Sequence, residues 1–342
     1  MKTGGMRRFF SVVLLLSVAV AAWACSRGGG GEVVVYTSLD RNLAEPVLRE
    51  FERQSGIRVK AVYDTEATKT TGLANRLAAE RAHPQADVFW NSETLRTVLL
   101  KRSGVLAPYR SPVAEGIPAR FKDSEGYWTG FAARARVIIV NTNLIAPRDE
   151  PKSIRDLTDA RWKGKAAMAL PLFGTTATHG AALFSAWGQD EARAFFSRVK
   201  ANDVAILLGN ATVKNRVAEG AFAWGFTDTD DVSAGLEDGR PVKMVFPDQG
   251  GIGSLLIPNT VALIAGAPHP NEGRKLIDYL LSEAVEARLA RGRGAQIPLR
   301  RGLAPPPRIP EASSLRWMEA DFERVGEAFE TSKAFFEKEW AR

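Results

Sequence analysis

The segment AWGFTDTDD, residues 223–231, ends in three carboxylates within four positions, Asp228, Asp230 and Asp231. A strand-like apolar run precedes them, and no Lys or Arg lies within five residues along the chain. Like charges at this spacing repel one another, which raises the pKa of each carboxyl until a cation or hydrogen-bond donors arrive. We therefore expect the stretch to form part of a ligand site, with a solvated turn as the alternative.

Polar segments follow several other predicted strands in the same way. In a parallel α/β sheet the carboxyl ends of the strands share one edge, where helix N-termini offer free N–H groups to ligands. We expect these segments to converge there. The candidate ligand-binding residues are Asp40, Glu66, Lys69, Thr70, Ser92, Glu93, Arg134, Arg136, Thr175, Thr176, Asn210, Thr227, Asp228 and Asp230.

Two kinds of ligand fit these residue types. Asp228, Asp230 and Glu93, joined by Asp40 or Glu66, offer the all-oxygen coordination that ferric iron, calcium or magnesium prefers. Arginines, hydroxyls and a helix N-terminus instead suit phosphate or carboxylate. Thiolate metal sites are excluded because Cys25 is the only cysteine, and the three histidines lie far apart in the sequence.

The elements that must position these residues alternate along the chain. Strand, polar loop and helix occur in that order three times, with strands predicted at 32–36, 57–63 and 86–90. The same order recurs after the later strands, and a further strand at 255–265 resumes the first set. This alternation predicts parallel α/β architecture. Aromatic residues at near-helical spacing across 315–340 predict an amphipathic helix docked on the body of the protein.

The N-terminus reads as a targeting segment. Lys2, Arg7 and Arg8 precede a short apolar stretch, and small residues lead to Cys25. We expect residues 1–24 to be a lipoprotein-type signal peptide, Cys25 to be lipidated and residues 25–31 to be a glycine-rich tether, with ordinary secretion as the alternative. The protein is then exported, to the periplasm or the cell surface. Removing residues 1–24 takes three cations and no anions, so the net charge falls from +7 to about +4. No basic cluster suggests nucleic acid.

The order of several motifs resembles a known family. VVVYTSLD (33–40), ADVFWNSE (86–93), RARVIIVN (134–141) and VAEGAFAWGF (217–226) occur in sequence, with FERQSGIRVK, GVLAPY and LTDARWKGKAAMALP between them. Together they resemble the extracellular solute-binding proteins of ABC importers, in the branch of the periplasmic ferric-ion-binding proteins. The resemblance covers almost the whole mature chain. It implies a two-lobed periplasmic binding protein of type II, a hinge of two extended crossings, and a permease and ATPase as partners.

The resemblance breaks at the ligand. The branch grips ferric iron with two adjacent tyrosines, which fall here on Thr227 and Asp228, and its histidine and glutamate fall on Asp40 and Ser92. The chain has five tyrosines and none is adjacent to another. The anion-binding half of the family site is matched instead: its helix start falls on Gly174, Thr175 and Thr176, its asparagine on Asn210, and its arginines on Arg134 and Arg136.

From the resemblance we expect lobe one to hold residues 32–134 and 255–305, and lobe two residues 135–254 and 306–342. The function expected is capture of a solute between the lobes by a monomeric protein without a cofactor. The sequence favours ferric iron or another hard cation with a synergistic anion, and the alternative is a small organic anion such as a sugar phosphate or an aminophosphonate. We do not expect an enzyme, because the sequence contains no nucleophile elbow, His-Glu-x-x-His motif or phosphate-binding glycine loop.

Overall fold

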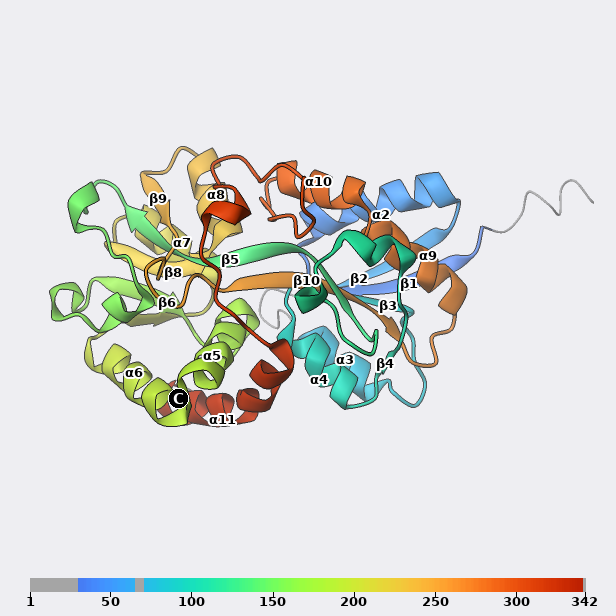
Figure 1. The fold of residues 1–342 in the computed structure, drawn as a ribbon, viewed down its shortest axis with the longest axis horizontal. Coiled ribbons are helices and arrows are strands. Elements are labelled where there is room, and N and C mark those ends of the chain that lie inside the picture. Colours follow the sequence, from blue (N-terminus) through green and yellow to red (C-terminus); the bar gives the residue numbers. More distant parts are fainter. Residues whose placement is uncertain (1–29, 65–70, 341–342) are drawn as a thin grey trace, which may run out of the picture.

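The computed structural model describes residues 30–64 and 71–340, and its sheet runs through two side-by-side halves (Figure 1). Residues 1–24, Cys25, Glu66, Lys69 and Thr70 lie outside the described residues. The strand order is β2-β1-β3-β10-β5-β8-β6-β7, with β4 paired to β10 and β9 to β5. None of the described helices is long and apolar enough to cross a membrane.

The first half is built from the N-terminal strands and a returning segment. Strands β1, β2 and β3 are parallel, whereas β10 runs antiparallel to β3 and carries the short β4. The strand bounds are β1 Glu32–Thr37, β2 Arg58–Tyr63, β3 Val88–Asn91, β4 Leu106–Ala107 and β10 Leu256–Ile264. The helices are α2 Arg41–Ser55, α3 Gly72–Ala79, α4 Leu95–Arg102, α9 Pro270–Leu280 and α10 Glu283–Arg291.

Helix α2 shows how the sequence pattern produces these elements. Its buried residues, Ala44, Val47, Leu48 and Phe51, recur at helical spacing and line one face. The helix ends at Gly56, whose φ of 70° lies in the left-handed region that glycine adopts without a steric penalty. The predicted order of strand, polar segment and helix is confirmed for β1–α2 and β3–α4.

The second half repeats this architecture. Strands β6 and β8 are parallel, as are β6 and β7, and β8 pairs antiparallel with β5. The strand bounds are β6 Ala166–Ala169, β7 Ala205–Leu207, β8 Trp224–Asp228 and β9 Val242–Val245. The helices are α5 Gly174–Trp187, α6 Gln189–Ala201, α7 Asn210–Ala218 and α8 Thr229–Glu237. Short 3-10 helices lie at Pro112–Gly116, Ala119–Phe121, Pro147–Asp149, Ile154–Thr158, Ala160–Trp162 and Ala312–Ser314.

Strand β5, Thr129–Asn141, joins the two halves and is buried along its whole length. Its residues up to Ala135 pair with β10, and those from Arg136 to Val140 pair with β8. The change of partner thus falls between Ala135 and Arg136. The division into lobes near residues 134 and 255 stays a prediction.

Helix α11, Phe322–Trp340, closes the lower face in Figure 1. It packs along α5 and against α6: between ring centroids, Phe336 lies 5.8 Å from Phe184 of α5 and 4.8 Å from Phe196 of α6. It also reaches α4 of the first half, through a Lys101–Glu323 ion pair of 3.3 Å and the guanidinium of Arg96 over the ring of Phe329. The predicted amphipathic helix is confirmed, but it begins at Phe322 because residues 315–321 form an extended connection to it.

Candidate functional site

The beginnings of helices from both halves gather where β5 crosses between them. Helices α5, α7 and α8 follow β6, β7 and β8 in the second half, and α4 follows β3 in the first. The first N–H groups of a helix have no intrahelical acceptor and carry the positive end of its dipole. Polar side chains placed among these N–H groups are therefore either held by hydrogen bonds within the protein or available to bind a ligand.

Asp228 is the last residue of β8 and is 1% exposed. Its Oδ1 accepts a hydrogen bond from Nη1 of Arg136 at 2.6 Å, and the two residues are also partners in the β5–β8 register. Its Oδ2 accepts from Oγ1 of Thr175 at 2.5 Å and from Nδ2 of Asn210 at 3.0 Å. One carboxylate therefore unites the beginnings of α5 and α7 with β5.

Arg134 links the acidic segment to the first half. Its Nη1 lies 3.1 Å from Oδ2 of Asp230 and 3.8 Å from Oδ2 of Asp228. Its Nη2 donates to the backbone oxygen of Ser92, at the end of β3. Both arginines were expected to hold the ligand's acidic group. In the structure they are paired with the protein's own carboxylates.

The expectation that crowding raises the carboxyl pKa values is wrong for Asp228. Burial raises its pKa, but attraction to Arg136 and Arg134 and the hydrogen bond from Thr175 outweigh burial, so the pKa lies below its ordinary value. Local sequence contains no compensating charge, whereas β-sheet pairing brings one from 92 residues away. The stretch is not a loop either, because Thr229, Asp230 and Asp231 form the first turn of α8. Negative side chains in a first turn interact favourably with the positive end of the helix dipole.

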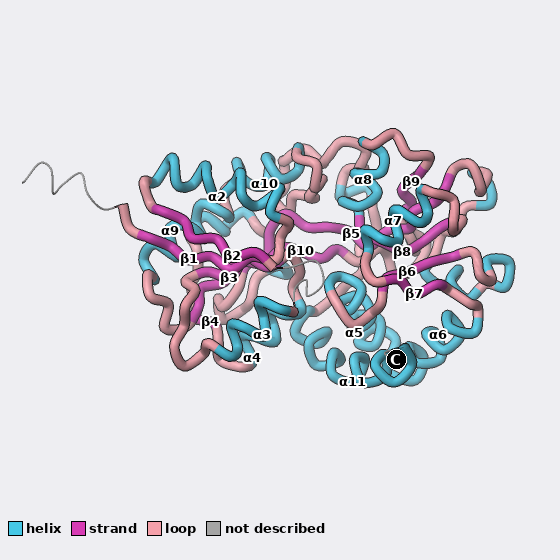
Figure 2. The backbone as a smooth tube through the Cα atoms, turned by 180° about the vertical axis from the view of Figure 1, so that it is seen from behind, coloured by secondary structure: helices cyan, strands magenta, loops and turns pink. Residues whose placement is uncertain are grey.

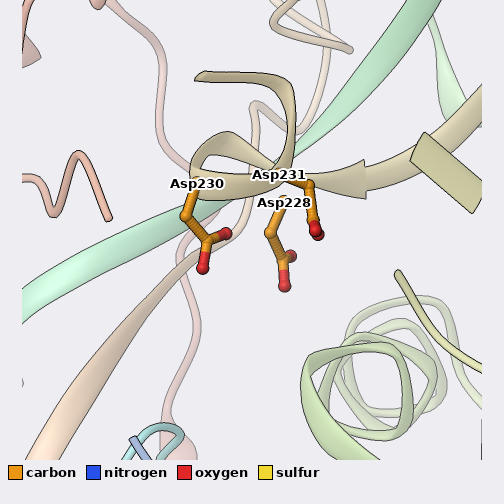
Figure 3. A group of neighbouring side chains, drawn as sticks. All are labelled: Asp228, Asp230 and Asp231. Carbon is orange, nitrogen blue, oxygen red and sulfur yellow. The ribbon is translucent and has the colours of Figure 1, made fainter. Parts of the chain in front are cut away.

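Three carboxylates nevertheless form a compact group. One oxygen each from Asp228, Asp230 and Asp231 can be chosen so that all lie within 4.8 Å of one another. Figure 3 shows all three side chains extending to the same side of the β8–α8 junction. Asp230 and Asp231 are half-buried, and Oδ2 of Asp231 accepts a hydrogen bond from Thr227 at 2.8 Å.

Glu93, expected as a metal ligand, is not part of this group among the described residues. Its carboxylate accepts from the backbone N–H groups of Leu95 and Arg96 and so caps the beginning of α4. It also accepts from Oγ1 of Thr178 on α5 at 2.9 Å. Because it is 1% exposed, we correct its role to that of a helix cap that bridges the two halves.

The other predicted residues occupy different positions around the network. Asp40 is exposed at the beginning of α2, and its charge acts on Arg134. Oγ of Ser92 lies 3.0 Å from Oγ of Ser38, and Thr176 donates to Asn210 at 3.2 Å. Glu66, Lys69 and Thr70 are outside the described residues.

Sequence reasoning missed Thr178 and His179. Thr178 lies one helical turn after Thr175 on α5, a spacing that could have indicated it. The ring of His179 stacks on Phe226 at 5.2 Å, and burial together with the charge of Arg136 holds the pKa of His179 well below its ordinary value. His179 is therefore neutral and adds no charge to the site.

Comparisons with known proteins agree with this architecture. The family model described as "Bacterial extracellular solute-binding protein" matches residues 86–324. Iron uptake protein A1 of Synechocystis sp. is 26% identical over 76% of this chain and 73% of its own length. A putative 2-aminoethylphosphonate-binding periplasmic protein of Salmonella typhimurium is 27% identical over 70% of this chain and 69% of its own length.

Among solved structures, iron-bound HitA from Pseudomonas aeruginosa superposes with a TM-score of 0.80 at 23% identity, over 90% of this chain and 99% of its own. This confirms the predicted fold class, a two-lobed periplasmic binding protein of α/β type. With the family model matching residues 86–324, this chain belongs to the bacterial extracellular solute-binding proteins.

Proposed function

We propose that this protein captures a hard cation between its two halves, with ferric iron as the first candidate, and delivers it to an ABC permease. The observation that carries the proposal is the group formed by Asp228, Asp230 and Asp231, whose oxygens lie within 4.8 Å of one another. Carboxylate oxygens are the ligands that such cations prefer. Relatives named for iron uptake support the choice of metal.

The three carboxylates have different roles in this proposal. Asp230 and Asp231 are half-buried and provide the direct ligands, whereas Asp228 is buried behind them. Oδ2 of Asp230 already accepts from Arg134, but each carboxylate oxygen has a second lone pair that can face a cation. The repulsion between the cation and Arg134 opposes binding, and the negative charge of Asp228 offsets it.

The second candidate ligand is a small organic phosphate or phosphonate. Nε of Arg134 and both Nε and Nη2 of Arg136 are buried, with no hydrogen-bond acceptor among the residues that the structure describes. Buried donors without an acceptor are costly, so a ligand oxygen near them would be bound strongly. In this alternative, Asp230 and Asp231 receive the ligand's hydroxyl or ammonium groups. The relative named for 2-aminoethylphosphonate supports this class.

Thermal melting separates the two candidates. The mature protein, dialysed against chelator, is melted with ferric citrate, citrate alone, calcium, magnesium, fructose 6-phosphate and 2-aminoethylphosphonate. A ligand that binds only the folded state raises the melting temperature with the logarithm of its concentration. A rise with ferric citrate but not citrate supports the cation, and a rise with a phosphorylated compound in the presence of chelator supports the second candidate.

The Asp231→Asn variant tests whether the acidic group provides the site. It should lose most of the ligand-dependent rise. Asp190→Asn is the matched control, because Asp190 is an exposed aspartate in the first turn of α6 and is not part of the acidic group. A ligand that stabilises Asp231→Asn as much as the parent chain would remove the acidic group from the site.

We also infer that the protein is a monomer that binds its solute without chemical turnover and is anchored by a lipid on Cys25. Family membership supports binding without turnover, because relatives of this chain are named as binding proteins. Unchanged phosphoester and peptide substrates after incubation, and loss of membrane association in Cys25→Ala cells, are the expected results. Light scattering at the mass of one chain tests the monomer.

A further inference from the structure

The side chain of Asp228 is surrounded by hydrogen-bond donors of the kinds that form an anion-binding site. Its two oxygens accept from a guanidinium, a hydroxyl and a side-chain amide, all at 3.0 Å or less. Thr175 is in the first turn of α5, and Asn210 is the first residue of α7. Within the described chain, neither helix is capped by the side chain of its N-cap residue, Phe173 or Gly209.

A guanidinium beside two helix N-termini is the arrangement that proteins use for free phosphate or carboxylate. Here the anion is covalently part of β8 and is 1% exposed. Arg134 adds a second positive charge 3.8 Å from the same carboxylate. A free anion would compete for the same donors against a carboxylate that loses no translational freedom by staying in place.

We propose that Asp228 is a built-in anion that fills the anion seat formed by Arg136, Thr175 and Asn210. The cation would then be bound without a small anion taken from solution, and a free anion would bind this seat only when Asp228 is removed. The part of the proposal that concerns the cation rests on the proposed function. The part that concerns the anion seat stands independently of it.

The anion seat is tested by chemical rescue. Asp228→Ala removes one carboxylate, and formate is the anion that replaces it atom for atom. The melting temperature of Asp228→Ala should rise by about 2 °C when formate reaches ten times its dissociation constant. The parent chain should not respond to formate beyond the response to chloride at equal ionic strength.

Two controls exclude a general salt effect. Asp228→Asn keeps the seat filled with an amide of the same size, so formate should not stabilise it. Asp231→Ala should not respond either, because it leaves the carboxylate of Asp228 in place on Arg136, Thr175 and Asn210. Absence of formate rescue in Asp228→Ala, or equal rescue in the parent chain, would overturn the built-in anion.

The cation part uses terbium(III) chloride as a hard, oxygen-preferring probe in a chloride buffer, followed by calorimetry. The parent chain should bind terbium equally with and without formate, whereas Asp228→Ala should bind about tenfold more weakly and recover with formate. If the parent chain required formate, the built-in anion would be wrong. If it bound no cation under any condition while Asp228→Ala still responded to formate, only the proposed function would fail.

Discussion

Removing the charge of Asp228 should destabilise the fold, because Arg136 is 0% exposed and would lose its close ion-pair partner. The change Asp228→Asn preserves shape and removes the charge. Breaking a buried ion pair on one side costs about 3–5 kcal/mol, since an uncompensated charge stays in the interior. Arg134 cannot take over the role of Asp228, because it is itself a cation.

A double-mutant cycle separates this ion-pair energy from general damage to the core. Arg136→Met removes the stranded charge, so the double variant Arg136→Met/Asp228→Asn should be more stable than the sum of the single changes predicts, by about 2 kcal/mol. Urea unfolding followed by tryptophan fluorescence measures all four proteins, and Trp224, buried on β8 itself, reports on this strand.

The pH dependence gives an independent check. The pKa of Asp228 is lower in the folded protein than its ordinary value, so the stabilisation is present above about pH 4 and is lost as the pH falls through the folded pKa. The stability gap between the parent chain and Asp228→Asn should stay constant from neutral pH down to mildly acid pH and then narrow. An Asp228→Asn protein as stable as the parent at neutral pH would refute the reasoning.

Three further predictions concern packing and ionisation elsewhere. Gly180→Ala should lower the stability by about 1 kcal/mol, because the new Cβ would lie 2.7 Å from Cε2 of Phe336 and the cost of overpacking exceeds the gain in helix propensity. Urea unfolding measures this loss. Gly235→Ala is the control: its nearest contact is at 3.2 Å, and it should be no less stable than the parent chain. Phe336→Ala should cost about 3–5 kcal/mol in the same assay, since the ring is fully buried between α5 and α11, and a loss below 1 kcal/mol would contradict this packing. Burial and a hydrogen bond to Glu80 raise the pKa of Tyr36 to about 12, so stability held below about pH 10 should be lost as the pH rises towards 12, and an ultraviolet titration that differs from that of Tyr36→Phe near pH 10 would contradict it.

Much of the fold could be predicted because its signals are local. The apolar runs of β1 and β3 and the helical spacing in α2 are each contained within a few residues. The position of Asp228 directly after an apolar run likewise marked the edge of a sheet. The beginning of α8 at Thr229 was missed because acidic residues suit both a polar loop and a first helical turn.

The electrostatics of the site could not be predicted, because they depend on register between distant strands. Arg136 meets Asp228 only because β5 and β8 pair antiparallel at that residue. Glu93 shows the same limit: its carboxylate was assigned to a metal by type, whereas its contacts with Leu95 and Thr178 require the geometry of two helices. The type of a residue indicates which chemistry it can do, and only its neighbours decide which one it does.

Under the proposed function, the contact between α11 and α4 ties ligand affinity to residues outside the acidic group. A hinged binding protein holds its solute in the closed arrangement, and its apparent dissociation constant is the intrinsic one divided by the closed fraction. The Lys101–Glu323 ion pair and the Arg96–Phe329 contact favour closure over any opening that separates α4 from α11. Each 1.4 kcal/mol of closure energy is worth about tenfold in affinity while most of the protein is open. Substitutions along this helix pair should therefore change the ligand affinity of this protein while its acidic group stays the same.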